Sequence, residues 1–561
     1  MKLQCLFVCL AGVALAAPRS STLKWWQTGV LYQIYPRSFK DSDGDGVGDL
    51  RGIREKLNYL KDLGVTGVWL SPIYKSPMAD AGYDIADFRD IDPVFGNMED
   101  FDALLKDTHE LGMKLIMDFV PNHSSDEHEW FVKASNPNDL EYEKYKGYYV
   151  WHDAKEDGSP PNNWRNVFGN GISGDAWTWN EKVGQYYLHQ FHQKQPDLNY
   201  RNADLVQEMK NVLKFWMDKG VDGFRVDAIQ RLVEDAEFKD NTPGTEDQVL
   251  DLPETYDMIE QWREVLDTYP DKFMMLEVYG GTKKTMEYFG TEERRGGDFP
   301  FNTFIIQSLN SDNLNAENLD KIIHQWIDNV PSFGWNNWLI GNHDNHRAAS
   351  RLGTTSIDAM NMVVMLLPGT AITYDGEEIG MTDNMDITYE EGQDPQGCTA
   401  GQEHFKDKSR DFERSPMQWD DSDNAGFSNG SSPWLPVNKN YVTVNVEAEL
   451  KDPLSHLSIY KKLVKSRNDP TIQTGDLKTA VLDTYVYSFS RRLDSNIYVV
   501  VLNIGDTKTT VDLTNELGID ASFLDVYVSN KESGLTEGQE IDVSSVEIGA
   551  HGAVVLVSAL D

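Results

Sequence analysis

The stretch MEDFDALLKDTHELGMKLIMDFVPNH, residues 98–123, contains the unit from which this chain is built. Its first part, Met98–Leu111, has the apolar spacing of an amphipathic helix, and Lys114–Val120 has the composition of a strand buried on both faces. Polar residues follow where the strand ends. A helix followed by a buried strand with polar residues at its carboxyl end is typical of α/β proteins that carry their sites there.

The same unit recurs along the chain from Gly29 onward. Short β-rich runs alternate with amphipathic segments such as Ala203–Lys219 and Ile357–Leu366. Taken as eight units of a strand followed by a helix, the alternation predicts an α/β fold, a closed (β/α)8 TIM barrel, rather than an open sheet. The predicted strands are Gly29–Tyr35, Val65–Leu70, Lys114–Val120, Gly223–Val226, Phe273–Val278, Phe299–Phe304, Asn337–Gly341 and Gly369–Tyr374.

Two regions interrupt this alternation. After the third strand comes a long, aromatic and turn-rich region, which predicts an inserted subdomain, domain B. Near the C-terminus the pattern changes to short alternating runs such as TYVYSFS and NIYVVVLNI, which predict an antiparallel β-sandwich. The predicted boundaries are 18–123 and 195–468 for the barrel, 124–194 for domain B and 469–561 for the sandwich.

The N-terminus has the pattern of a secretory signal peptide, residues 1–17. Lys2 precedes the apolar run Leu3–Ala17, which ends in small residues and is too short to span a bilayer. We therefore expect a secreted, extracellular protein without a transmembrane segment. Removal of the signal leaves Cys398 as the one cysteine, which excludes an internal disulfide. Asn429–Ser431 is a possible N-glycosylation sequence.

The composition limits the possible partners. A net charge of −40, from 91 acidic and 51 basic residues, repels phosphate backbones and anionic lipid, so nucleic-acid binding is not expected. The charge is compatible with neutral substrates and with a bound cation. The 15 Trp and 24 Tyr residues suit sugar binding, although most of these rings are expected in the core.

Ionisable side chains gather at the carboxyl ends of the predicted strands. A capping Asp or a buried structural His would explain any one of them, but not their presence on four strands. Glycoside hydrolysis with retention needs two carboxyl groups about 5–5.5 Å apart, and adjacent strands would place Asp227 and Glu277 close enough. Arg225 would point the same way as Asp227 and hold it ionised. The strand-end residues are Asp118, Asn122, His123, Arg225, Asp227, Glu277, His343 and Asp344.

Six segments of the chain resemble the α-amylase family of glycoside hydrolases. The overall likeness is to its oligo-1,6-glucosidase and maltase branch, and within that branch to secreted insect maltases. It extends from about Trp25 to the C-terminus. The segments are DFVPNH (118–123), QPDLN (195–199), GFRVDA (223–228), LEVY (276–279), NHD (342–344) and RSPMQWD (414–420).

This resemblance implies an exo-acting retaining α-glucosidase that forms a covalent glucosyl-enzyme. Asp227 would be the nucleophile, Glu277 the acid/base and Asp344 the stabiliser of the transition state. The implied substrate-binding residues are Asp80, Tyr83, His123, Phe168, Arg225, His343, Arg347 and Arg410.

Ala228 bears on the linkage that is cleaved. The α-1,6-specific members of the branch tend to carry Val directly after the nucleophile, whereas Ala228 resembles the α-1,4-cleaving members. We therefore expect maltose, maltooligosaccharides and sucrose as substrates.

The segment DSDGDGVGD, residues 41–49, has the composition of a cation loop. Hard cations such as Ca²⁺ take six to eight oxygens on a tightly turning loop. Position twelve of the loop is Gly52 rather than Glu, which argues against an EF-hand. A structural Ca²⁺ is also what the resemblance implies, and a solvated acidic turn is the alternative. The predicted ligands are Asp41, Asp43, Asp45, the carbonyl of Val47, and Asp49.

Other functions on the same scaffold stay open at this point. One is a non-catalytic binding or receptor protein, as in the amino-acid transporter heavy chains that resemble this family. Those chains carry a transmembrane helix and lack an intact triad of carboxylates, whereas this chain keeps all three. A related isomerase or an amylase is a second alternative, and the oligomeric state is not predicted.

Overall fold

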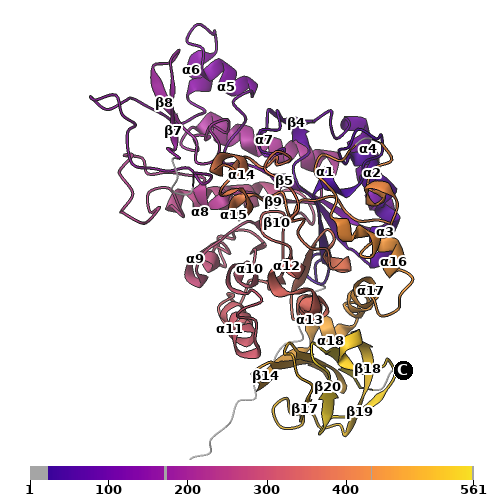
Figure 1. The fold of residues 1–561 in the computed structure, drawn as a ribbon. Coiled ribbons are helices and arrows are strands. Elements are labelled where there is room, and N and C mark those ends of the chain that lie inside the picture. Colours follow the sequence, from indigo (N-terminus) through magenta and orange to yellow (C-terminus); the bar gives the residue numbers. More distant parts are fainter. Residues whose placement is uncertain (1–22, 170–173, 431, 559–561) are drawn as a thin grey trace, which may run out of the picture.

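The computed structural model describes residues 23–169, 174–430 and 432–558 (Figure 1). The predicted signal peptide, residues 1–17, lies outside the described residues. Eight parallel strands form one sheet in the order β11-β10-β9-β5-β2-β1-β13-β12, and the predicted barrel is confirmed. These strands are β1 Val30–Ile34, β2 Gly67–Leu70, β5 Lys114–Phe119, β9 Gly223–Val226, β10 Phe273–Leu276, β11 Phe299–Pro300, β12 Asn337–Trp338 and β13 Thr370–Tyr374.

Strands β11 and β12 are two residues each, shorter than the sequence pattern predicts. The gap between them is bridged by a side chain instead of a backbone ladder. Asn337 Nδ2 donates to the carbonyl of Pro300 at 2.9 Å, and Asn337 Oδ1 accepts from Asn302 N at 2.9 Å. The side chain of Asn337 takes the place of backbone pairing here, so a single buried side-chain amide joins β12 to the end of β11.

Helices surround the barrel and pack their apolar faces on it. In α7 the Asn202 side chain caps the first turn by accepting from Asp204 N and Leu205 N, and Gly220 ends the helix in the left-handed region at φ 113°. The helices of the barrel region are α1 Pro36–Phe39, α2 Leu50–Glu55, α3 Leu57–Leu63, α4 Met98–Glu110, α7 Ala203–Lys219, α8 Pro253–Leu266, α9 Thr282–Glu287, α10 Phe304–Ser308, α11 Ala316–Ile327, α12 Ala348–Leu352, α13 Ile357–Leu366, α14 Pro395–Ala400, α15 Phe405–Lys408, α16 Val446–Glu449 and α17 His456–Ser466.

The segment after β5 forms a small layer of its own, drawn in purple at the top of Figure 1. A three-stranded antiparallel sheet in the order β6-β8-β7 packs around a core that contains Trp164 and Trp177. A separate antiparallel pair, β3 with β4, follows β2. The elements are α5 Glu129–Ala134, α6 Tyr142–Lys146, β6 Trp151–His152, β7 Trp177–Asn180, β8 Gln185–Leu188, β3 Tyr74–Lys75 and β4 Asp87–Ile91.

The C-terminal region is an antiparallel β-structure at the opposite end of the molecule (Figure 1). A six-stranded sheet, β14-β15-β16-β21-β18-β19, and a two-stranded sheet, β17-β20, enclose a second apolar core. The predicted antiparallel C-terminal region is confirmed. The elements are α18 Pro470–Thr474, β14 Asp476–Asp483, β15 Val486–Leu493, β16 Asn496–Asn503, β17 Thr509–Val511, β18 Phe523–Ser529, β19 Glu540–Asp542, β20 Val546–Ile548 and β21 Ala553–Val557.

Helix α13 joins the barrel to this region. All ten of its residues are buried, and eight of them are apolar; the other two are Asp358 and Asn361. Its last carbonyls accept from two buried arginines, Met365 O from Arg467 at 2.6 Å and Leu366 O from Arg491 at 2.8 Å. These bonds satisfy carbonyl groups that a helix end leaves unpaired.

Candidate active site

A cavity of about 440 Å³ lies where the barrel strands end. Asp227 directly follows β9 and Glu277 directly follows β10, so the register of two neighbouring strands brings both carboxyl groups to its wall. The residues around the cavity are Asp80, Tyr83, His123, Val167, Phe168, Phe191, Asp227, Ala228, Gln230, Arg231, Glu246, Leu250, Glu277, Tyr279, Asp344, Asn345, Gln396 and Arg410.

One guanidinium, that of Arg225, binds three carboxyl groups of this site. Its Nη1 donates to Asp118 at 3.0 Å and also to Asp227, and its Nη2 contacts Glu277 Oε1 at 2.8 Å. The second oxygen of Glu277 accepts from Ala228 N at 2.9 Å. Arg225 is 1% exposed, because successive side chains of β9 alternate and this one points with Asp227 into the barrel mouth. The predicted pairing of Arg225 with Asp227 is therefore present.

Burial disfavours the ionised form of these carboxyl groups. It raises the pKa of Asp118 to about 7 and raises the pKa of Asp227 above its ordinary value, while Arg225 acts in the opposite direction on both. The single guanidinium therefore offsets only part of the effect of burial on the pKa values of Asp118 and Asp227.

A chain of hydrogen bonds links His343, Tyr83 and Asp118. Gln33 Nε2 lies 2.7 Å from His343 Nδ1, which must accept because an amide nitrogen only donates. His343 Nε2 then carries the hydrogen and donates to the Tyr83 hydroxyl at 2.6 Å, which donates to Asp118 Oδ2 at 3.2 Å. The rings of Tyr83 and His343 stack with centroids 5.4 Å apart. Burial lowers the pKa of His343 well below its ordinary value, so the ring is neutral.

Asp344 is held by two arginines. Arg410 Nη1 donates to Asp344 Oδ1 at 3.0 Å and Arg414 Nη2 donates to the same oxygen at 2.7 Å. Arg414 also donates from Nε to the carbonyl of His343 at 2.7 Å. Burial alone would raise the pKa of Asp344, but its contacts with His343 and the two arginines hold that pKa well below its ordinary value. Asp344 is consequently ionised at any physiological pH.

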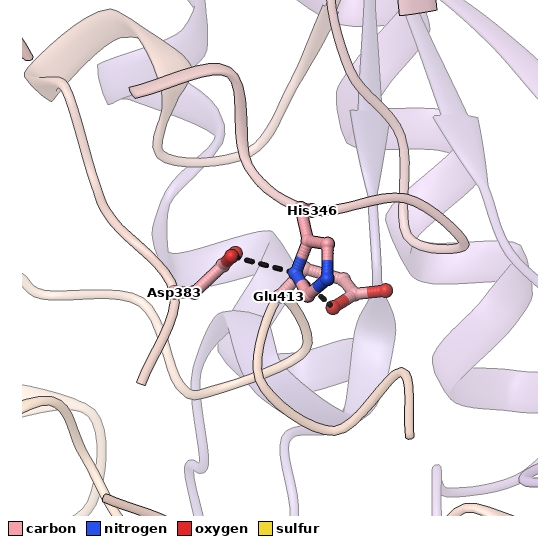
Figure 2. A group of neighbouring side chains, drawn as sticks. All are labelled: His346, Asp383 and Glu413. Atoms are coloured by element: carbon pink, nitrogen blue, oxygen red, sulfur yellow. Dashed lines mark hydrogen bonds and ion pairs between the residues drawn. The ribbon is translucent and has the colours of Figure 1, made fainter. Parts of the chain in front are cut away.

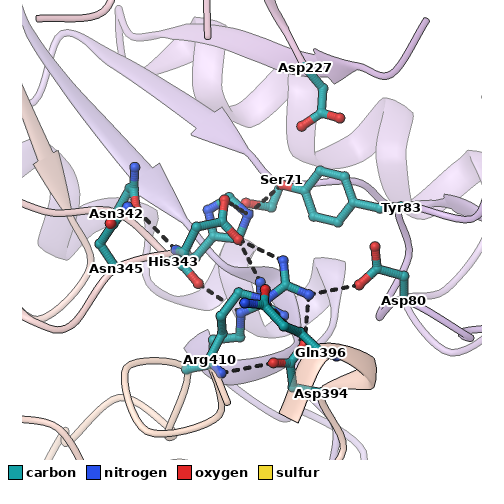
Figure 3. Close-up of polar contacts among 12 residues, drawn as sticks. Ser71, Asp80, Tyr83, Asp227, Asn342, His343, Asn345, Asp394, Gln396 and Arg410 are labelled. Atoms are coloured by element: carbon teal, nitrogen blue, oxygen red, sulfur yellow. Dashed lines mark hydrogen bonds and ion pairs between the residues drawn. The ribbon is translucent and has the colours of Figure 1, made fainter. Parts of the chain in front are cut away.

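Arg410 connects opposite sides of the cavity, and Figure 3 shows it between Asp80 and Asp394. Its Nη2 donates to Asp80 at 3.0 Å and to Asp394 at 2.6 Å, and its Nε donates to Asp394 at 3.0 Å. The guanidinium lies 5.2 Å from the centre of the Phe168 ring. Charge pairs on both sides and a ring over its face keep this side chain in one orientation.

His123 completes the site on the side of Asp80. Its Nδ1 donates to Asn122 Oδ1 at 3.0 Å, and its Nε2 accepts from Gln195 Nε2 at 3.0 Å. Gln195 also donates to Asp80 Oδ2 at 3.0 Å. Burial lowers the pKa of His123 to about 4, which keeps the ring neutral.

The structure does not bring Arg347 to the cavity. Its guanidinium is 1% exposed, donates to the carbonyl of Asp375 at 2.6 Å and lies 4.7 Å from the centre of the Tyr374 ring. Arg347 thus packs beneath the site, against the end of β13.

Gln195, Asp394 and Arg414 are among the residues with close contacts at the site for which the sequence predicts no role. Gln195 and Arg414 begin the segments QPDLN and RSPMQWD, which single them out without indicating what they bind. Asp394 caps α14 in a loop without a distinctive pattern, so only the folded chain shows that it binds Arg410.

The acidic loop after α1 gathers three carboxylates away from the cavity. One oxygen from each of Asp41, Asp43 and Asp49 lies within 4.8 Å of the other two. Asp45 lies outside this group, and its Oδ1 accepts from Val47 N at 2.8 Å. Gly44 and Gly46 turn the loop at φ 85° and 97°, a region that disfavours residues with a side chain. An all-oxygen set on a tight turn fits a hard cation.

A family model of the alpha-amylase catalytic domain matches residues 33–475. The chain belongs to the α-amylase family. It is 44% identical to Maltase A1 of Drosophila melanogaster, across 95% of this chain and 96% of that one. It is 37% identical to an amino acid transporter heavy chain of Homo sapiens, across 96% of this chain and 78% of the relative.

Among solved structures, the trehalulose synthase MutB of Pseudomonas mesoacidophila superposes with a TM-score of 0.86 at 32% identity. The match covers 96% of this chain and 100% of that one. Within the described ranges, no helix has the length and apolar character needed to cross a membrane.

Proposed function

We propose that this α-amylase family member is an exo-acting retaining α-glucosidase that releases terminal α-1,4-linked glucose from maltose, maltooligosaccharides and sucrose. The observation that carries the proposal is the single guanidinium of Arg225, which contacts Asp227 and Glu277 together at the cavity wall. Retention requires two carboxyl groups about 5–5.5 Å apart, and a shared guanidinium supports a spacing of that order.

In the proposed reaction Asp227 attacks the anomeric carbon of the terminal glucose, while Glu277 protonates the oxygen of the departing sugar. The bond between glucose and the departing sugar breaks, and a covalent glucosyl-enzyme forms. Glu277, now ionised, takes a proton from water. That water attacks the anomeric carbon, releases Asp227 and leaves the product glucose in the α configuration.

Asp344, held by Arg410 and Arg414, would stabilise the transition states that lead to and from the covalent glucosyl-enzyme. The sugar gains positive charge and flattens in the transition state, and an ionised carboxylate that binds its hydroxyl groups interacts more strongly then than in the ground state. Arg410 and Arg414 keep Asp344 ionised and fixed in place. The site therefore does not have to reorganise as the charge develops.

The size and walls of the cavity support a short substrate. About 440 Å³ is toward the low end of the usual range of ligand pockets, roughly 300–1,000 Å³. Arg410 ties Asp80 to Asp344 across one side, and Tyr83 and Phe168 offer flat faces to a sugar ring. A pocket of this kind would accept one terminal glucose and exclude the middle of a long polysaccharide.

The test compares wild type with Asp227→Asn and Glu277→Gln on maltose, sucrose, isomaltose and starch, with product anomers followed by NMR. We expect α-glucose from maltose and sucrose, and loss of this activity in both variants. Asp62→Asn, an exposed change on α3, is the matched control and should behave as wild type. Release of β-glucose would contradict the retaining mechanism, and full activity of Asp227→Asn would exclude Asp227 as the nucleophile.

Family membership alone does not separate an enzyme from a binding protein, because the relatives include both a maltase and a transporter heavy chain. The grouping of Asp227, Glu277 and Asp344 around one cavity favours the enzyme. Wild type that turns over none of the four sugars, yet is stabilised by maltose in a melting experiment, would favour the binding protein.

We also propose a structural Ca²⁺ at the acidic loop, with Asp41, Asp43 and Asp49 as carboxylate ligands and Asp45 and the Val47 carbonyl completing the shell. The all-oxygen donor set supports it. The loop lies apart from the cavity, so the ion would stabilise the fold without taking part in a catalytic step. A chelator should remove one calcium per chain, measured by metal analysis, and lower Tm.

Secretion is proposed from the sequence. Mass spectrometry of the mature protein should find an N-terminus at Pro18. Asn429 is exposed, although Ser431 of the same sequence lies outside the described residues. A glycan mass at Asn429 would confirm the proposed glycosylation, and a retained Met1–Ala17 segment would contradict secretion by this signal.

A further inference from the structure

A histidine and two carboxyl groups meet in one place (Figure 2). None of the three lines the active-site cavity. His346, Asp383 and Glu413 come from three separate loops of the chain. One ligand atom from each lies within 4.8 Å of the other two. No step of the proposed reaction uses them.

The three side chains differ in exposure in a way that suits a site at a surface. The side chains of Asp383 and Glu413 are 3% and 2% exposed, whereas that of His346 is 47% exposed. His346 Nδ1 lies 2.7 Å from Asp383 Oδ2 and 3.9 Å from Glu413 Oε2. Two fixed acids thus face one imidazole that solvent reaches.

Asp383 is held in this position by its neighbours. Its second oxygen, Oδ1, accepts from Arg347 N at 2.7 Å, and its own N–H donates to Ser350 Oγ at 2.8 Å. Oδ2 is therefore directed at His346 by contacts that do not depend on the histidine.

Glu413 supplies an independent reason to expect a ligand. Its Oε2 is buried and has no hydrogen-bond partner within the described part of the chain. The segment cannot easily turn away, because the Glu413 carbonyl accepts from the Tyr374 hydroxyl at 3.1 Å. A buried oxygen without a partner costs free energy that a bound cation would offset.

We propose that His346, Asp383 and Glu413 bind a divalent transition-metal ion of the zinc class. Ca²⁺ and Mg²⁺ prefer all-oxygen shells, whereas an imidazole with two carboxylates suits Zn²⁺ and its neighbours in the series. Three protein ligands leave a fourth position for water on the exposed side of the histidine.

The geometry requires only small shifts. Zn²⁺ binds nitrogen and oxygen at about 2.0–2.2 Å, which places tetrahedral ligands roughly 3.4 Å apart. His346 Nδ1 must move away from Asp383 and toward Glu413, and its exposed side chain has the freedom to do so.

Occupancy would act on the neighbouring active site through two short connections. Glu413 adjoins Arg414, which binds Asp344 at 2.7 Å, and His346 is two residues after Asp344. A metal ion would join these segments and restrict their motion. Because it would bind the folded chain better than the unfolded one, it should raise Tm.

The test titrates Zn²⁺ into the full mature chain with Ca²⁺ in excess, so that the acidic loop at Asp41 does not compete. Calorimetry measures affinity and stoichiometry, and a melting curve measures the Tm shift. His346→Ala and Glu413→Gln remove one ligand each. His324→Ala is the matched control, because His324 also contacts two carboxylates, at 3.7 and 3.2 Å, but on the open surface of α11.

We expect one Zn²⁺ per chain and a rise in Tm. Both ligand variants should lose more affinity than the roughly 10–100-fold that removal of a ligand's hydrogen-bond partner costs. The control should keep the affinity of wild type. A crystal measured at the zinc absorption edge should give one anomalous peak among the three side chains. A peak elsewhere, or unchanged affinity in His346→Ala and Glu413→Gln, would overturn the proposal.

Discussion

The hydroxyl of Tyr83 offers a sharp test of how the site is organised, because one substitution, Tyr83→Phe, removes it and leaves the ring. The hydroxyl accepts from His343 Nε2 at 2.6 Å and donates to Asp118 Oδ2 at 3.2 Å. The ring stacks on His343 with an interplanar angle of 7°. The change therefore separates the hydrogen-bonding role of Tyr83 from its stacking role.

The expected cost follows from the partners left behind. A buried donor without an acceptor costs about 1–3 kcal/mol. His343 Nε2 has a second acceptor nearby, Asp344 Oδ2 at 3.3 Å, so we expect the lower part of that range, about 1–2 kcal/mol. If this cost falls on the transition state, kcat/KM decreases by about 5–30-fold.

Tyr83→Ala should cost more, because it also removes the ring from His343 and opens a cavity, each with its own penalty. Both variants would be assayed for kcat/KM on maltose and for Tm. Tyr256→Phe is the control, since its hydroxyl bonds Glu287 at 3.0 Å outside the cavity. Unchanged kcat/KM and Tm in Tyr83→Phe would show that the hydroxyl contributes nothing to the site, and equal losses in Tyr83→Phe and Tyr83→Ala would show that the ring contributes nothing.

Four further outcomes are expected. Arg347→Met should destabilise the fold by about 3–5 kcal/mol in urea unfolding, because it removes the guanidinium beside the buried carboxylate of Asp375. An effect confined to KM would instead show contact with substrate. Burial lowers the pKa of His128 to about 3, whereas a histidine in the unfolded chain has a pKa near 6.5, so the unfolded chain takes up the proton first and stability present above pH 6.5 is lost toward pH 3. Over that range Tm of wild type should fall relative to Tm of His128→Asn. Plots of Tm against pH that run parallel for the two proteins would contradict this. Ala228 lies at φ 47°, where a β-branched residue is strained, so Ala228→Val should lower Tm. The same change should raise the ratio of isomaltose to maltose cleavage. An unchanged ratio would show that this position does not select the linkage. Asp43→Asn should weaken calcium binding and abolish the effect of a chelator on Tm, and an undiminished effect would place the ion elsewhere.

Much of the barrel was predictable because its signal is local. Each strand is a short apolar run followed by polar residues, and the eight predicted runs all contain strands of the sheet. The ends of β11 and β12 were not predictable, because Asn337 replaces part of the ladder with side-chain bonds to a residue 37 positions away. Nothing in the immediate sequence around Phe299 indicates that contact.

The local sequence pattern is enough to predict which chemical groups reach the mouth of the barrel, since strand alternation directs Arg225 and Asp227 to the same side and Glu277 lies at the end of a strand. How those groups are charged and oriented depends on the three-dimensional fold. Arg414 and Asp394 lie 70 and 50 residues beyond Asp344, and their contacts around Arg410 and Asp344 depend on where distant loops fold back. Electrostatic interactions depend on distance through space and on burial, and neither quantity can be predicted from the local pattern of residues.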